Sequence, residues 1–259
     1  MSLGTFAAIG SFLALLAAAV FLAWLAFALG RWLGRREARR EDREHEGPVG
    51  SVVGATLALL AFTLAITFNM AHTKHNGRKE LVREDVKSIR NAYDRALLMP
   101  ADEAASARAL LTEYARLRAF DPFGADPAPI EQIVERSESI QHALWEQAIA
   151  HRDHSQLRFY MDSLSALSNT HAERVTMGMH DRVPMPVWIC LWAVTALGMM
   201  TMGYQSSLVG SKRAWAMFPL IIAFCVMLCL AVDLDRPQQG VLRVDQSPML
   251  RLADALEKG

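Results

Sequence analysis

The chain has 259 residues, with 27 basic and 27 acidic side chains, so its formal net charge is zero. This balance provides no strongly basic face, which excludes nucleic acid as a partner. Hydrophobic residues make up 52% of the chain and charged residues 21%, and the two kinds are segregated along the sequence. This segregation predicts a membrane protein.

Four runs without charged side chains have the length of membrane-spanning helices. The hydrocarbon core of a bilayer is about 30 Å thick, and roughly 20 helical residues are needed to cross it. The first run is too long for the apolar core of a signal peptide, and no small-residue cleavage pattern follows it. We therefore predict transmembrane helices over 6–29, 49–71, 187–208 and 214–232.

The first predicted region, 1–48, ends in an arginine-rich loop that bears on orientation. The sequence "RWLGRREARREDREHEG" carries six arginines, and Lys212 and Arg213 lie between the last two predicted helices. Short loops rich in lysine and arginine favour the cytoplasm, whereas long domains have little influence. The charges therefore predict that both termini and the long segment between helices two and three lie on the non-cytoplasmic side.

The second predicted helix belongs to region 49–76 and carries polar residues inside its apolar part. One face of this helix, at steps of three and four, contains Thr56, Leu60, Thr63, Thr67 and Met70. A threonine hydroxyl in lipid can bond to the carbonyl one turn back, so this face could serve helix packing. Alternatively, it lines a water-filled path, with Phe62 and Ile66 on a neighbouring face as a candidate apolar constriction. One helix cannot enclose a path, so the second interpretation requires an oligomer.

Basic residues cluster where this helix would leave the membrane. Lys74, Arg78 and Lys79 would form a basic ring at a pore mouth if they were repeated around a symmetry axis, and such a ring would favour anions. The alternative is that they anchor the helix at the interface, as flanking lysine and arginine residues commonly do.

Residues 77–183 predict a helical domain outside the membrane. Apolar residues recur at helical spacing from 78 to 98, from Ala101 to Leu117, over 130–151 and over 155–180. The proline- and glycine-rich segment "FDPFGADPAP" predicts a loop between the second and third of these helices. No segment alternates like a strand, so the predicted fold class is all-α, with this domain inserted between membrane helices two and three.

Region 184–233 contains the last two predicted membrane helices, and 234–259 forms a C-terminal tail. Asp233, Asp235 and Arg236 lie at the junction. A carboxylate near the membrane boundary usually has a partner, for which Arg174 and Arg182 are the candidates. This group could act as a gate latch or ion site, or it could lock the tail to the domain.

The sequence carries no pattern of an enzyme, and we expect no catalytic residue, cofactor or metal. The histidine pairs 72/75 and 151/154 have the spacing of metal ligands but lack a convincing third ligand. Phosphate-binding loops and nucleophile elbows are absent from the sequence. The three cysteines, Cys190, Cys225 and Cys229, fall in predicted membrane helices, where thiols usually serve as small apolar fillers.

Four blocks of sequence resemble the bestrophin-like family of bacterial membrane proteins, which are distant relatives of the bestrophin ion channels. The blocks are "LLAFTLAITFNMAHTKHNGRKELVREDVKSIRNAYDRALLMP", "LSALSNTHAERVTMGMHDRVPMPVW", "GYQSSLVGSKRAW" and "DLDRPQQGVLRVDQSPML". Their order and spacing match over nearly the whole chain.

Two shorter motifs resemble the bestrophins themselves. The helix that follows the bestrophin pore helix has its counterpart in Arg78, Lys79 and Leu81, followed by Arg90-Asn91. The block before the third membrane helix is matched by Glu173-Arg174-Val175 and by "VPMP" at 183–186. The paired tryptophans and the asparagines of the bestrophin neck exit are missing, and so is an acidic calcium clasp, so calcium gating is not implied.

The resemblance implies a homopentameric ion channel of the bacterial inner membrane. Its second helix would line the axis and continue into the helical domain, and its partners would be lipids and its own copies. The basic ring of Lys74, Arg78 and Lys79 makes chloride the expected permeant ion, with anions slightly preferred over cations. Bestrophins place the helical domain in the cytosol, which conflicts with the orientation that the charges predict. The alternative is a non-conducting membrane scaffold or sensor, monomeric or dimeric, whose helical domain binds a partner. A transporter would usually show broken helices or an inverted repeat, which this sequence lacks.

Overall fold

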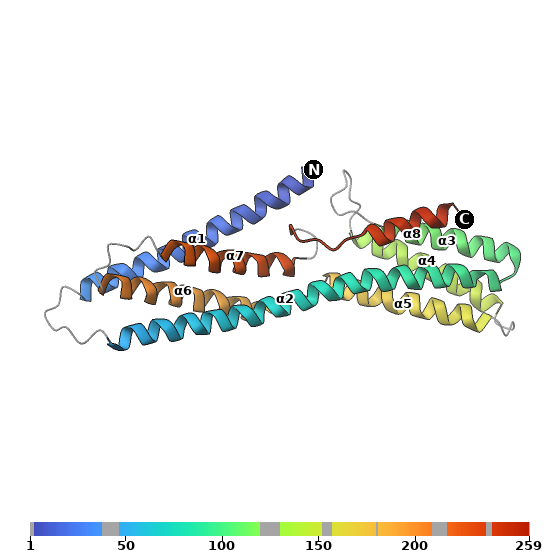
Figure 1. Cartoon of the computed structure of the whole chain (residues 1–259). Coiled ribbons are helices and arrows are strands. Elements are labelled where there is room, and N and C mark those ends of the chain that lie inside the picture. The colour runs from blue at the N-terminus through green and yellow to red at the C-terminus, as the bar shows by residue number, and fades with distance from the viewer. Residues whose placement is uncertain are drawn as a thin grey trace. The chain divides into compact units, whose positions relative to one another are not determined.

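The computed structural model describes residues 3–37, 47–119, 130–151, 157–179, 181–208, 217–236 and 240–258. Within these ranges the chain is helical and contains no strand, which confirms the predicted all-α class. In chain order (Figure 1) the elements are α1 (Leu3–Glu37), α2 (Gly47–Arg95), the short 3-10 helix η1 (Ala96–Leu98), α3 (Ala101–Arg118), α4 (Ile130–Ala150), α5 (Leu157–Met179), α6 (Met185–Leu208), α7 (Phe218–Asp235) and α8 (Ser247–Glu257).

The described helices form two compact units. The membrane unit comprises Leu3–Thr73 and Arg182–Leu242, and the extramembrane unit comprises Lys74–Asp181 and Arg243–Gly259. Helix α2 is continuous and contributes to both units, because no helix-breaking residue interrupts it between Pro48 and Arg95.

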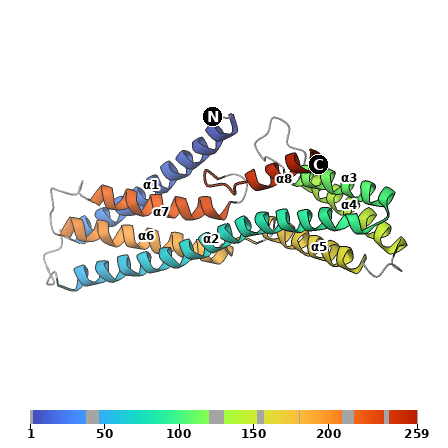
Figure 2. The same ribbon diagram turned by 45° about the vertical axis from the view of Figure 1, so that its right-hand side comes forward.

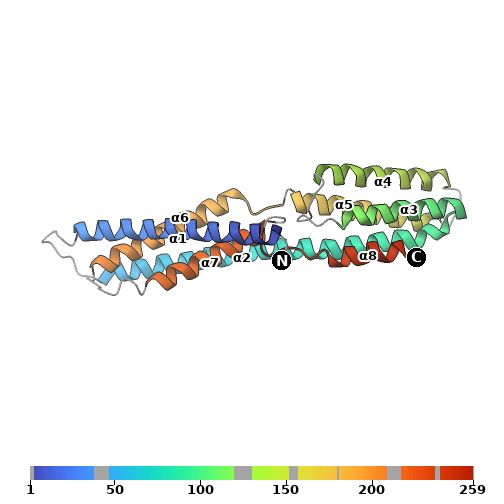
Figure 3. The ribbon, with the colours of Figure 1, turned by 90° about the horizontal axis from the view of Figure 1, so that it is seen from above.

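The membrane unit contains the four helices that are long and apolar enough to cross a bilayer, which confirms the four predicted spans. Its helix α1 packs on α6 and α7 (Figure 3). The close packing of α1 on α6 depends on glycines: a Cβ at Gly30 would lie 1.9 Å from the Met200 carbonyl oxygen, and one at Gly203 would lie 2.1 Å from that of Phe27. Apolar side chains from α1, α2, α6 and α7 fill the remaining core.

The observed ends of α7 differ from the prediction of 214–232. The helix begins at Phe218, next to Pro219 in its first turn, where a missing N–H is tolerated; residues 214–216 lie outside the described ranges. The helix continues through Asp233 to Asp235. The carboxylates of both residues accept hydrogen bonds from backbone N–H groups, so these charged residues are accommodated at the helix end. The predicted span ends at residue 232 because Asp233 is the first charged residue after the uncharged run.

The extramembrane unit consists of α3, α4, α5 and α8 together with the charged half of α2 (Figure 2). Its core is built from the apolar face that each helix presents at helical spacing, and its largest fully buried side chains are Tyr114 and Tyr160. Helix α8 packs along α3 and buries Met249, Leu252 and Leu256. Arg116 of α3 forms a solvent-exposed ion pair with Glu257 at the end of α8.

Candidate functional site

Helix α2 presents one uncovered face within the membrane unit. We define the exposed stripe of α2 as eight exposed residues that follow one another at steps of one to four: Ser51, Ala55, Ala58, Phe62, Ala65, Ile66, Asn69 and Thr73. On a helix this spacing brings them to one side. Val52, Gly54, Leu59, Ala61 and His72 are exposed beside the stripe. In the extramembrane unit, Asn76, Glu80, Arg83 and Lys87 are likewise exposed at steps of three and four.

The opposite face of α2 packs inside the subunit. Val53, Leu60, Leu64 and Thr67 are buried, with Thr67 0% and Leu60 1% exposed. The Leu60 side chain lies against α6, where it would approach a Cβ at Gly198 to 3.6 Å. Side chains enclosed in their own subunit cannot line a lumen, so Leu60 and Thr67 leave the set of residues expected to line a pore.

The remaining residues of the predicted threonine face lie at the edge of the packed surface. Thr56, Thr63 and Met70 are half-buried. The Thr56 hydroxyl donates to the Val52 carbonyl at 2.7 Å, and that of Thr63 donates to Leu59 at 2.8 Å. The Thr67 hydroxyl donates to the Thr63 carbonyl at 2.9 Å. These bonds agree with the packing interpretation of the threonines, because each hydroxyl is satisfied by its own helix.

The two residues of the candidate constriction belong to the exposed stripe. Phe62 is 64% exposed and Ile66 is 46% exposed. The exposed face of α1 also mixes large apolar side chains, such as Phe21 and Leu22, with alanines such as Ala14 and Ala17. On α2 the exposed alanines between positions 55 and 65 are interspersed with Leu59 and Phe62, which are 53% and 64% exposed.

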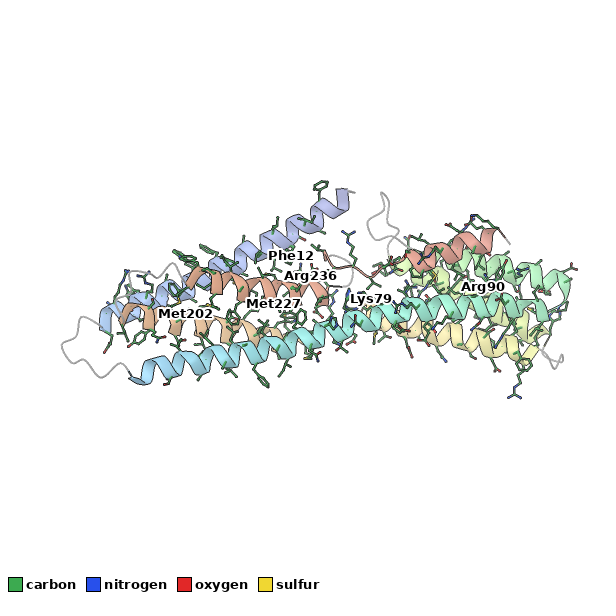
Figure 4. The ribbon with its side chains drawn as sticks, in the orientation of Figure 1. Phe12, Lys79, Arg90, Met202, Met227 and Arg236 are labelled. Atoms are coloured by element: carbon green, nitrogen blue, oxygen red, sulfur yellow. The ribbon has the colours of Figure 1, made fainter. Side chains whose placement is uncertain are left out.

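Two of the three residues of the predicted basic ring, Lys74 and Arg78, make polar contacts within the subunit. Lys74 forms an ion pair with Asp181, so its charge is compensated locally. Arg78 is only 6% exposed, and its guanidinium donates to the carbonyl oxygens of Met177 (3.2 Å) and Asp181 (2.9 Å). Lys79 is half-buried on α2 (Figure 4). Within the subunit, therefore, the charge of Lys74 is compensated and Arg78 is buried, while Lys79 is half-buried.

The acidic pair at the end of α7 binds backbone N–H groups. The Asp233 carboxylate accepts from Val241 at 2.9 Å and from Leu242 at 2.8 Å, which holds the segment after α7 against the helix end. Gly240 is required there, because a Cβ would lie 2.9 Å from the Asp233 carbonyl oxygen. Asp235 accepts from the Val183 N–H at 2.9 Å. Arg236, which follows the helix, is exposed (Figure 4).

Arg174, one of the two residues expected to pair with these aspartates, has another role. It pairs with Asp85, which is fully buried, and it also donates to the Gln246 side chain at 3.0 Å. Arg118 donates to the same Asp85 oxygen at 3.0 Å. Buried Arg118 and half-buried Arg174 thus share one carboxylate, and desolvation together with the charge of Arg118 lowers the pKa of Arg174. The prediction that Arg174 pairs with the aspartates of α7 was wrong. Its carboxylate partner is Asp85 on α2, which no local sequence pattern identifies as its partner.

A second buried polar group lies beside this cluster. Gln141 donates to the Tyr114 hydroxyl at 3.1 Å, and that hydroxyl lies 3.1 Å from His171 Nδ1. Burial, together with the charges of Arg118 and Arg174, lowers the pKa of His171 to about 4, against the opposing charge of Asp85. Burial also raises the pKa of Tyr114. Neither of these two buried polar clusters was predicted from the sequence. The position of Asp85 between the core residues Val82 and Ile89 is the one signal in the sequence that indicates a buried carboxylate.

Comparisons with known proteins agree with this architecture. A family model described as a bestrophin-like domain matches residues 17–249. No curated protein matches the chain. Among solved structures, one variant of a bacterial bestrophin homologue from Klebsiella pneumoniae has a TM-score of 0.64 at 14% identity and covers 96% of this chain and 97% of its own. A second variant has a TM-score of 0.64 at 16% identity, covering 97% and 96%.

A third similar structure is described only as a membrane protein, with a TM-score of 0.62, 15% identity and 96% of each chain covered. At these identities the solved structures establish the fold. The family model spans part of α1, all of α2, α6 and α7, and nearly all of the extramembrane unit, and it therefore shows the family. The chain is a membrane protein that belongs to the bestrophin-like family.

Proposed function

We propose that this chain is the subunit of a homo-oligomeric ion channel of the bacterial inner membrane, with the exposed stripe of α2 lining the pore. The observation that carries the proposal is the stripe itself, which combines three alanines, the larger apolar Phe62 and Ile66, and the polar Ser51, Asn69 and Thr73. Five subunits are expected from the resemblance to bestrophins.

The composition of the stripe favours water over lipid as its surroundings. An unsatisfied carboxamide in hydrocarbon costs several kcal/mol, about 2–7 depending on the reference state. Asn69 is exposed on the stripe, so its carboxamide would lose its hydrogen bonds to water if lipid tails surrounded it. A single helix cannot surround an aqueous path, so several copies of α2 must enclose it.

Phe62 and Ile66 are proposed as the narrowest part of this path. Both are exposed on the stripe and lie one helical turn apart. Repeated around an axis, their side chains would form an apolar ring, and such rings gate ion flow by excluding water.

The structure does not favour strong selection between anions and cations. The preference for anions depended on Lys74, Arg78 and Lys79, of which Lys74 is paired with Asp181 and Arg78 is bound to carbonyl oxygens. On the exposed side of α2 in the extramembrane unit, Glu80 and Arg83 form a 3.3 Å ion pair and cancel each other. We therefore propose weak charge selectivity, with chloride as one of the permeant ions.

The test is ion flux in proteoliposomes that contain a detergent-purified, size-checked oligomer, with chloride and potassium measured separately. The expected result is flux of both ions that persists at about one oligomer per vesicle. A stable oligomer without flux under any condition, or a monomer without flux, would contradict the channel and favour the scaffold.

A further inference from the structure

Asn69 and Thr73 stand one helical turn apart on the exposed stripe, directly after Phe62 and Ile66. We propose that they form an ion-binding site in the pore, where repeated carboxamide and hydroxyl groups replace part of the hydration shell of a monovalent ion. This inference rests on the proposed function, and it assigns to the pore a specific site and ligand chemistry.

The hydrogen bonding of the threonines separates Thr73 from the others on α2. Thr56, Thr63 and Thr67 each donate to the carbonyl four residues earlier, so their hydroxyl groups are occupied. Within the part of the chain that the structure describes, neither the Thr73 hydroxyl nor the Asn69 carboxamide has a hydrogen-bond partner. Both groups are exposed, so they are available to an ion or to water.

The chemistry of the two side chains determines which ions the site would take. A carboxamide offers two N–H donors and one carbonyl acceptor, and a hydroxyl offers one donor and two lone pairs. These groups can therefore coordinate either sign of charge. Lys74, the charged residue that follows them, is paired with Asp181 and adds no net charge. The site would bind monovalent anions and cations weakly, with the sign set by rotation of the side chains.

Two other surroundings could account for a polar pair on this face. Lipid is disfavoured, because Asn69 would lose its hydrogen bonds to water without replacement. A contact with a second copy of α2 would satisfy the same groups, but it would make them contribute to assembly and not to the concentration dependence of flux. The following experiment distinguishes a contact from an ion site.

The experiment measures proteoliposome flux of Rb⁺ and of Br⁻ as a function of salt concentration, for the wild type, Asn69→Leu and Thr73→Val. The matched control is Thr67→Val, which removes a buried hydroxyl that is already bonded within its own helix. Oligomer size is checked for each protein. Loss of a hydrogen bond of ordinary strength predicts that Asn69→Leu and Thr73→Val raise the half-saturating ion concentration at least about threefold, whereas Thr67→Val leaves it unchanged.

If the wild type conducts and both Asn69→Leu and Thr73→Val keep its half-saturating ion concentration, this inference is overturned while the channel proposal stands. Dissociation of the oligomer in Asn69→Leu, with unchanged concentration dependence in Thr73→Val, also overturns it and identifies a subunit contact. Absence of wild-type flux overturns the channel proposal itself, and the inference with it.

Discussion

Asp85 is fully buried, and its carboxylate is shared by Arg118 and Arg174. In Asp85→Asn the side-chain shape is kept, but the buried guanidinium of Arg118 and the half-buried one of Arg174 lose their counter-charge. Breaking a buried ion pair from one side costs about 3–5 kcal/mol. We therefore expect a clear decrease in the unfolding temperature of the extramembrane unit, measured by circular dichroism. The control is Glu84→Gln, at an exposed position next to Asp85 on α2; equal unfolding temperatures for the two variants would contradict this account.

His171 gives the extramembrane unit a pH dependence of known sign. Its pKa in the folded protein is lowered from 6.5 to about 4, so between these values the unfolded chain binds a proton that the folded chain does not. Stability is therefore complete above pH 6.5 and decreases as the pH falls toward 4. The unfolding midpoint of the wild type should drop over this range more steeply than that of His171→Gln. Parallel curves would show that His171 does not titrate as proposed.

At the residue scale, the sequence shows which positions are polar but does not predict which polar side chains contact each other in the fold. Asp85 stands at a core position between Val82 and Ile89, a pattern that indicates a buried carboxylate. Its partners, Arg118 and Arg174, come from α3 and α5, and nothing local identifies them. For the same reason Arg174 was assigned to the aspartates at the end of α7, whose carboxylates accept backbone N–H groups instead.

At the scale of a helix, the contact between α1 and α6 has no room for a side chain at Gly30. Gly30→Ala would push its Cβ against the Met200 carbonyl, so we expect loss of the folded membrane unit, seen as aggregation or a shifted peak in size-exclusion chromatography. Gly10→Ala on the same helix meets nothing within 4 Å and should be tolerated, since alanine has the higher helix propensity. Similar behaviour of the two variants would contradict the close packing.

The membrane helices could be predicted because the bilayer imposes a length and excludes charge, and both properties are visible in one stretch of sequence. The packed side of α2 could not be predicted in the same way. Leu60 and Thr67 share a face with Thr63 by spacing alone, but α6 covers that side and leaves Phe62 and Ile66 exposed. Which face of an apolar helix is covered depends on tertiary contacts that have no local signal.

At the scale of the whole molecule, orientation in the membrane follows from the arginines after the first helix. The charge rule predicts a cytoplasmic loop there and a non-cytoplasmic extramembrane unit, whereas the resemblance to bestrophins implies the reverse. We expect Ala105→Cys, exposed on α3, to react with a membrane-impermeant maleimide in intact spheroplasts. The wild type, whose cysteines are all in α6 and α7, measures the background. Labelling only after lysis would establish the bestrophin orientation.

The central claim is that the exposed stripe of α2 lines a pore formed by several copies of the chain. The most direct measurement is ion flux through size-checked oligomers of Ala58→Trp, compared with Ala17→Trp. Ala58 is on the stripe, and Ala17 is exposed on α1 among large apolar residues. We predict that Ala58→Trp blocks flux with the oligomer intact, because an indole fills the lumen, while Ala17→Trp conducts like the wild type. Full flux in an intact Ala58→Trp oligomer would contradict the claim and move the pore to another face.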